Sequence, residues 1–208
     1  MRLFTFPGTY EDDRGIEPLE WRITPTWPVG WAPGYAVSTV IRGVRVRGGD
    51  FDVLLPRERG AGDGLLRWDR IALVDCILGG DIPITVESGG VARPAVLRFK
   101  LDLRRSSRDD PGAGILRLTC LLDDVETSVT DDWFEDGLIA LEAALPGGHQ
   151  VMGCITCEYA DHSPTGHGLS GMRCRRDADI AGVPSAAGIT EEVLETHLCT
   201  SFRRRSAA

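Results

Sequence analysis

The sequence has no long run of apolar residues, although 42% of its 208 residues are hydrophobic. No stretch approaches the ~20 apolar residues of a membrane-spanning helix, so we expect no membrane partner. The first residues, Met1 to Pro7, also lack the apolar run and small-residue cleavage site of an export signal. We therefore expect a cytoplasmic protein.

Positive charge is scarce. The formal net charge is -8, and Lys100 is the only lysine. A protein that binds nucleic acid regardless of its sequence needs a clustered cationic surface, so this balance argues against a nucleic-acid partner. From Leu118 to Met172 the chain has ten acidic residues and neither lysine nor arginine. That pattern is typical of a solvated helix face and strand ends.

The chain has no internal repeat or heptad array, and its length suits one large domain or a main domain with a small appendage. Its central part consists of short apolar or β-branched runs broken by glycine, proline and aspartate, which predicts an antiparallel sheet or sandwich. In one run the odd-numbered residues are apolar and should point inward. The runs are 36–46, 65–77, 82–86, 95–103 (the alternating one) and 115–122.

The first 35 residues are rich in proline and tryptophan, including Trp21, Trp27 and Trp31. Each proline removes a backbone donor and restricts the residue before it, so this segment cannot be a long helix. One interpretation is an exposed aromatic surface for a sugar or a peptide. We favour a loop that covers the sheet with its indoles, because an indole buries a large apolar area.

Two helices are indicated. The first is expected at about 131–145, with Thr130 as N-cap and with acidic residues in its first turn, where the helix dipole favours anions. Its apolar face comprises Phe134, Leu138, Leu141 and Leu145. The second is expected from Thr190 to about Leu198. Together these patterns predict an α+β fold, mainly an antiparallel β sheet or sandwich with one packed helix. Residues 1–148 would form this β-rich domain, and 149–208 a small C-terminal zinc-bound module.

The six cysteines fall into two groups. Cys76 and Cys120 lie in apolar runs that resemble core strands, so we expect buried, inert thiols there. The other four lie in the last third of the chain. With no export signal, reduced thiols that bind metal fit this arrangement better than disulfides.

The four late cysteines predict a metal site. A C-x2-C pair lets two thiolates hold one ion from a single turn, and two more thiolates follow after 16 and 24 intervening residues. Four thiolates satisfy tetrahedral Zn²⁺ with no open position. Alternatively, His162 or His167 replaces one thiolate and frees the last cysteine. The predicted zinc ligands are Cys154, Cys157, Cys174 and Cys199.

A four-thiolate zinc site carries a formal charge near minus two and needs nearby cations or amide donors. Arg173, Arg175 and Arg176 surround the third predicted ligand and could supply that charge. The alternative is that these arginines only face solvent.

The loop from Glu158 to Gly171 holds the one dense group of nucleophile, base and ligand types in the chain. Asp161, His162, Ser163 and His167 lie there. A catalytic triad is one interpretation. However, no strand-turn-helix nucleophile elbow precedes the serine, and the side chains of two sequence neighbours need not converge.

The residues from Cys154 to Arg175, followed by Thr196-His197-Leu198-Cys199, resemble a family of uncharacterised bacterial proteins. The similar motif of that family reads roughly C-x2-C-x-Y-S-D-x-S-P-x-G-x-x-x-F/L-G-x-M-x-C-F, then a late Y/H-L-C. Ala160 stands where the motif has serine, and Arg175 where it has phenylalanine. The resemblance is specific over about 145–204 and loose over the sheet. It implies the metal site and the two-part layout, but no reaction.

These observations rank three functional hypotheses. The first is a non-catalytic accessory protein, whose zinc-bound C-terminal module presents a surface to a protein partner. The second is an enzyme with a pocket at the loop 158–171, using Asp161, His162 or His167 as its acid-base group. The third is a thiol redox or metal-relay protein acting through Cys154 and Cys157. The sequence leaves the substrate, the pathway and the oligomeric state open.

Overall fold

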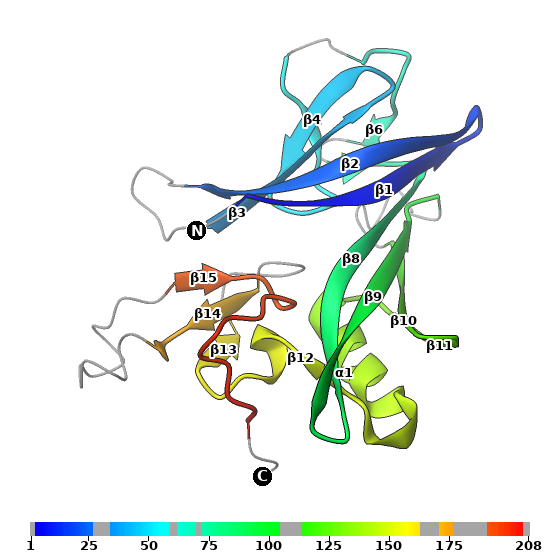
Figure 1. The fold of residues 1–208 in the computed structure, drawn as a ribbon. Helices are drawn as coiled ribbons and strands as arrows, with labels where there is room; N and C mark the ends of the chain where they lie inside the picture. The colour runs from blue at the N-terminus through cyan, green and yellow to red at the C-terminus, as the bar shows by residue number, and fades with distance from the viewer. Residues whose placement is uncertain are drawn as a thin grey trace.

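The computed structural model describes residues 3–26, 34–58, 62–69, 72–104, 114–162, 171–176 and 191–205. These residues are mostly antiparallel β-sheet with one α-helix, as the sequence predicts. The large sheet has the order β11-β10-β9-β8-β1-β2-β3-β4-β5, with β12 paired to β8 (Figure 1). Its strands are β1 (Phe4–Asp12), β2 (Gly15–Thr26), β3 (Gly34–Ile41), β4 (Val44–Gly48), β5 (Leu55–Pro56), β8 (Ile77–Ser88), β9 (Val91–Asp102), β10 (Ile115–Leu122), β11 (Val125–Asp131) and β12 (Gln150–Met152).

The remaining elements are short, apart from the helix. β6 (Trp68–Asp69) pairs with β7 (Ala72–Leu73), and a three-stranded sheet has the order β13-β14-β15. The helix α1 follows β11 and contacts β10 and β11. The bounds are α1 (Phe134–Ala144), the 3-10 turns η1 (Pro146–Gly148) and η2 (Cys154–Thr156), and the strands β13 (Ala160–His162), β14 (Met172–Cys174) and β15 (Glu191–Val193).

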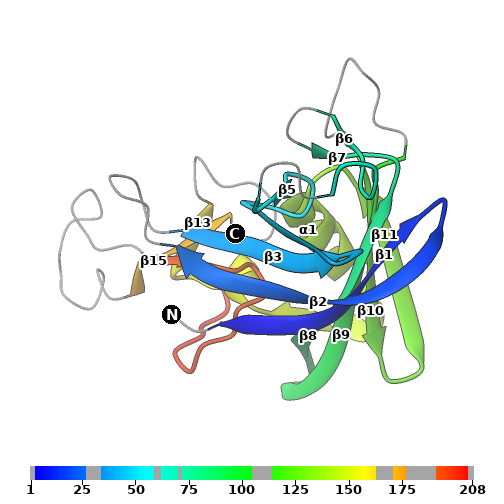
Figure 2. The same cartoon turned by 90° about the horizontal axis from the view of Figure 1, so that it is seen from above.

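The long strand β8 joins the two halves of the large sheet. It pairs with β9 along its whole length. On its other side, residues 77–80 pair with β1 and residues 85–87 pair with β12. β1 and β2 therefore run across the direction of β8 and β9, as both views show (Figures 1 and 2). This bend places β12 and the C-terminal segment beside the half of the large sheet that is lower in Figure 1.

The core contains an aromatic cluster that joins these two halves. The ring of Phe51 lies 4.9 Å from that of Trp21 and 4.5 Å from that of Phe99. Trp21 is completely buried, and its Nε1 donates a hydrogen bond to the carbonyl oxygen of Gly79 at 2.8 Å. The indole thus satisfies its single donor inside the core.

The prediction that the first 35 residues form a covering loop is wrong, because residues 4–26 form the strands β1 and β2. Pro7 and Pro18 are tolerated because each lies where its strand has a neighbour on one side only. The burial of Trp21 also removes it from an exposed aromatic surface. Trp27 and Trp31 lie outside the described residues.

The predicted strands are confirmed in outline. Residues 36–46 contain a hairpin, since the chain turns between β3 and β4 at Arg42 and Gly43, which have φ of 51° and 79°. The described part of 65–77 contains the short strands β6 and β7, and β8 begins at Ile77. In β9, Leu97 and Phe99 are buried, as the alternating pattern predicts.

The first predicted helix is confirmed, but its start is wrong. Thr130 and Asp131 remain in the β10–β11 ladder, opposite Arg117 and Leu116, and the N-cap residue is Trp133. Cross-strand pairing outweighs the local capping signal here. The buried residues of the helix are Phe134, Gly137, Leu138 and Leu141. They include three of the four residues of the predicted apolar face, and the fourth, Leu145, is buried just beyond the end of the helix.

The second predicted helix is wrong over the described residues 191–198. Glu191–Val193 form β15, which pairs with β14, and a turn follows. The boundary predicted between 148 and 149 remains a prediction, although β12 beyond it joins the large sheet. No helix in the described part of the chain is long and apolar enough to span a membrane.

Candidate metal centre

The C-x2-C pair lies on a tight turn that is fixed from two sides. Cys154 begins the 3-10 turn η2, and the amide of Cys157 donates to its carbonyl oxygen at 3.1 Å. The Thr156 hydroxyl donates to the carbonyl oxygen of Val151 at 2.9 Å, which ties the turn to β12. A Cβ at Gly153 would fall 2.7 Å from the carbonyl oxygen of Glu195, so only glycine fits this approach.

The other two cysteines reach the turn from later segments. Cys174 lies in β14, opposite Ala160 of β13. Cys199 lies in the C-terminal segment, which runs back along the turn and pairs with it through two backbone hydrogen bonds. The Glu158 amide donates to the Arg203 carbonyl oxygen at 2.8 Å, and the Arg205 amide donates to the Thr156 carbonyl oxygen at 2.9 Å, which together form a bridge between Cys157 and Arg204.

The four thiols converge closely enough to influence one another electrostatically. Burial raises the pKa of Cys154, and the charges of Cys174, Cys157 and Cys199 raise it further. Burial also raises the pKa of Cys174, and Cys157 and Cys199 act on it in the same direction. Four ionised thiols here would repel one another, so their ionisation requires a cation.

Arginine and an amide supply positive potential at this cluster. The Arg176 amide donates to the Cys174 thiol, and its guanidinium charge also favours the thiolate there. Its Nη1 lies 3.9 Å from the sulfur of Cys199. Arg175 instead forms an ion pair with Asp161 at 2.8 Å. Of the three predicted arginines, Arg176 is therefore the one that contacts the thiols, and Arg175 is not only solvent-facing.

The described residues include all four predicted ligands, and none of the six cysteines of the chain is in a disulfide. Within those residues, however, no group of three or more His, Cys, Asp or Glu side chains is arranged so that it could hold a metal ion. Cys76 and Cys120 are buried far from solvent, as predicted, and burial raises the pKa of both thiols, that of Cys76 to about 12.

The loop 158–171 is described only at its two ends. Asp161 is about half exposed and ion-paired with Arg175. The backbone of His162 lies in β13. Ser163 and His167 lie outside the described residues. A pocket of about 490 Å³ lies between the sheet and the residues that precede Cys199. Its lining is mainly apolar and includes Phe4, Tyr35, Ile84, Leu194, His197 and Leu198.

Sequence reasoning missed a group of carboxylates at the junction of the helix and the C-terminal segment. Glu195 is fully buried; its Oε1 accepts a bond from the Gly171 amide, and its Oε2 has no hydrogen-bond partner among the described residues. A Cβ at Gly171 would fall 1.8 Å from Oε1 of Glu135 and 2.9 Å from Oε1 of Glu195, so the two carboxylates lie close together. Burial raises the pKa of Glu195 well above its usual value, and the charges of Glu135 and Asp50 raise it further.

Asp50 belongs to the same group. Burial and the charge of Asp52 raise its pKa to about 7, although its Oδ1 accepts a bond from the Phe51 amide. The signal in the sequence was weak, because Asp50, Glu135 and Glu195 are far apart along the chain. Around Glu195 itself, the one signal in the sequence is that a charged residue directly follows the apolar Leu194.

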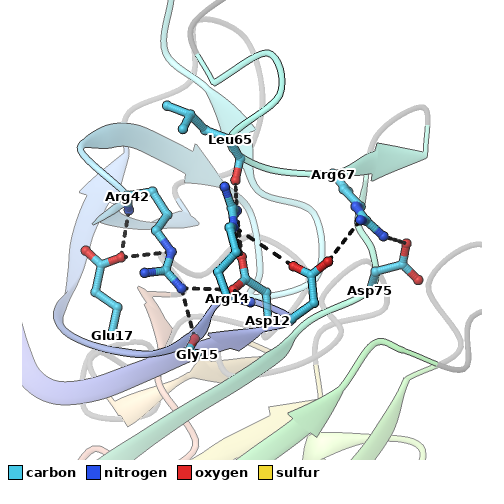
Figure 3. Close-up of polar contacts among 9 residues, drawn as sticks. Asp12, Arg14, Gly15, Glu17, Arg42, Leu65, Arg67 and Asp75 are labelled. Atoms are coloured by element: carbon cyan, nitrogen blue, oxygen red, sulfur yellow. Dashed lines mark hydrogen bonds and ion pairs between the residues drawn. The ribbon is translucent and has the colours of Figure 1, made fainter.

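A second polar group missed by sequence reasoning lies around the turn between β1 and β2 (Figure 3). Asp12 accepts bonds from Arg14 and from Arg42, the latter at 2.9 Å, and Arg42 also pairs with Glu17. Burial opposes ionisation of Asp12, but these bonds lower its pKa to about 2. Arg14 also donates to the carbonyl oxygen of Leu65. Every charged side chain drawn in Figure 3 has a partner. Because these partners come from different segments, the group holds together the β1–β2 turn, the β3–β4 turn and the loop before β6.

A family model described as a family of unknown function (DUF6304) matches residues 4–160. The match covers the large sheet, the helix and the C-x2-C pair, and it ends before Cys174 and Cys199. No curated protein and no solved structure matches the chain.

Proposed function

The chain belongs to this family of unknown function, and we propose its role from its own geometry. It is a zinc-binding accessory protein. Cys154, Cys157, Cys174 and Cys199 hold one structural zinc ion, which fixes the C-terminal segment so that it presents a surface to a protein partner.

The mutual influence of the four thiols carries this proposal. Segments separated by 16 and 24 residues bring their cysteines to one turn, where the charges of Cys157, Cys174 and Cys199 raise the pKa of Cys154, and those of Cys157 and Cys199 raise the pKa of Cys174. A divalent cation removes that repulsion, and four thiolates complete the tetrahedral shell that Zn²⁺ prefers. Arg176 offsets the remaining negative charge.

Zinc binding requires the four sulfurs to draw closer together than they stand here, since no described group is arranged to hold a metal. The two partly exposed ligands, Cys174 and Cys199, would be the ones to move toward the turn. Cys154 and Cys157 are buried on the fixed turn and would form the stationary half of the site.

The redox alternative is less well supported. A redox or relay dithiol needs an accessible thiol with a lowered pKa. Cys154 is buried and its pKa is raised. The enzymatic alternative has no observation in its favour at Asp161, whose carboxylate is engaged by Arg175.

Metal analysis of the purified protein tests the proposal. We expect about one zinc per chain in the wild type, and loss of most of it in Cys174→Ser. Cys120→Ala is the matched control, since it removes a buried thiol outside the cluster and should retain the metal. His162→Ala and His167→Ala test the imidazole alternative and should also retain zinc. A zinc-free wild type, or a Cys154–Cys157 disulfide, would contradict the proposal.

A further inference from the structure

The outer face of the β2–β3–β4 hairpins carries a row of arginines. Arg22 of β2 lies opposite Ser38 of β3, and Ser38 lies opposite Arg47 of β4. Arg45 lies two residues before Arg47, so the two side chains leave the same face about 7 Å apart. The Arg57 amide, just beyond β5, donates to the Arg45 carbonyl oxygen at 2.9 Å, which places Arg57 on the next strand, about 5 Å away.

These side chains line a groove of about 690 Å³, a size suited to a small organic molecule. We call it the arginine groove. Its cationic part is formed by Arg45, Arg47 and Arg57. A less polar part lies beside it, where Val40 is 47% exposed. The groove is also lined by Glu17, Pro18, Leu19, Glu20, Arg22, Thr24, Ser38, Thr39 and Val46.

The three arginines are electrostatically unbalanced. In the part of the chain that the structure describes, no carboxylate forms an ion pair with Arg45, Arg47 or Arg57. The two acidic residues of the groove are already engaged, because Glu20 pairs with Arg22 at 2.9 Å and Glu17 pairs with Arg42 at 3.5 Å. Three neighbouring cations repel one another, and they do so in a chain whose net charge is -8. An anion in the groove would relieve that repulsion.

We propose that the arginine groove binds a small organic phosphate, with its phosphate groups on Arg45, Arg47 and Arg57. Guanidinium groups match phosphate oxygens with two parallel hydrogen bonds, and three of them supply more charge than a single carboxylate needs. The organic part of the ligand lies over Pro18, Leu19 and Val40. This site is separate from the cysteine cluster, so it stands whether or not the chain binds zinc.

The test is calorimetric titration of the purified full chain with ADP in phosphate-free buffer, followed by displacement with pyrophosphate. We expect saturable binding to the wild type and displacement by pyrophosphate. Arg45→Gln combined with Arg47→Gln should weaken ADP binding at least about tenfold, as expected for loss of charge-assisted bonds. Arg93→Gln combined with Arg98→Gln is the matched control, with the same charge change on solvent-facing arginines of β9, and should change affinity by less than about twofold.

Three results would overturn the proposal. The first is no saturable ADP binding by the wild type. The second is equal weakening in the control, which would mean a diffuse charge effect. The third is saturable binding of a hexaglutamate peptide without binding of ADP, which would make the groove a docking surface for an acidic protein.

Discussion

Glu195 is a buried carboxylate, and its Oε2 has no hydrogen-bond partner among the residues that the structure describes. Burying a charge without compensation is costly, so burial raises the pKa of this carboxyl group well above its usual value. Its folded-state pKa is raised above the unfolded value. The stability it contributes is therefore complete below the unfolded pKa and is lost as pH rises through the folded pKa.

We expect the free energy of unfolding of the wild type to fall between about pH 4 and pH 7, because burial raises the pKa of Glu195, and raises that of Asp50 to about 7, in the folded chain only. Glu195→Gln keeps the shape of the side chain but removes the carboxyl group that titrates. It should flatten this slope by up to about 1.4 kcal/mol per pH unit and stabilise the chain at neutral pH. Urea unfolding across this range measures the effect. Glu126→Gln, at an exposed position of β11, is the control, and an unchanged slope in Glu195→Gln would contradict the assignment.

The buried thiols outside the cluster make a second prediction at this scale. Cys76→Ala and Cys120→Ala each remove a buried sulfur from the core and should lower the free energy of unfolding by about 1–3 kcal/mol. The zinc content should not change, because neither residue lies near the four late cysteines. Thermal unfolding combined with metal analysis separates the two effects. Loss of metal in either variant would show that the cysteines are divided wrongly.

At the scale of the elements, the side chain of Arg204 links the C-terminal segment to three others. Arg204 donates to Glu142 of α1 at 3.1 Å and to the carbonyl oxygen of Val151 in β12 at 3.1 Å, and it lies 3.9 Å from Glu87 of β8. One guanidinium thus joins the segment to the helix and to two strands of the large sheet. Its side chain is 24% exposed, so these contacts are only partly screened by solvent.

Arg204→Ala should destabilise the chain by about 1–3 kcal/mol, because Glu142 loses its charged partner and the Val151 carbonyl loses one of its two side-chain donors. Arg203→Ala is the matched control: its side chain is 70% exposed, its contact with Glu158 is 3.5 Å long, and the change should cost less than about 0.5 kcal/mol. Urea unfolding of the two variants measures the difference. Equal effects would mean that the segment is held by its backbone contacts alone.

At the scale of the whole molecule, the chain should loosen in two steps. The described residues around the cysteines form short strands and add a few side chains, among them Ile155, Met172 and Val193, to the edge of the core of the large sheet. Metal binding couples to folding where a segment buries little apolar surface of its own. Removal of zinc with a strong chelator should therefore accelerate hydrogen exchange in residues 154–205 and leave β1, β8 and β9 protected. Acceleration from residue 36 onward would indicate one cooperative unit, and no change after proven zinc removal would overturn the structural role of the ion.

The sequence by itself determined the class of fold and the burial of Cys76 and Cys120. Period-two alternation in 95–103 identified a strand and its buried side, because alternate side chains of a strand point to opposite faces. The apolar stripe at 134–145 identified the helix for the corresponding reason at a period of 3.6. These are local signals, since each depends only on residues that are close along the chain.

Only the tertiary structure decided the features that depend on distant partners. β1 and β2 form strands despite their prolines because neighbouring strands pair with them and because the buried indole of Trp21 donates a hydrogen bond to Gly79 of β8. Residues 191–193 form a strand, against their helical pattern, because β14 offers a ladder. Asp50, Glu135 and Glu195 meet although they lie far apart in sequence. In each case the free energy of long-range pairing or burial exceeds the local conformational preference. A short window of the sequence does not include the distant partner, so it cannot reveal this contribution.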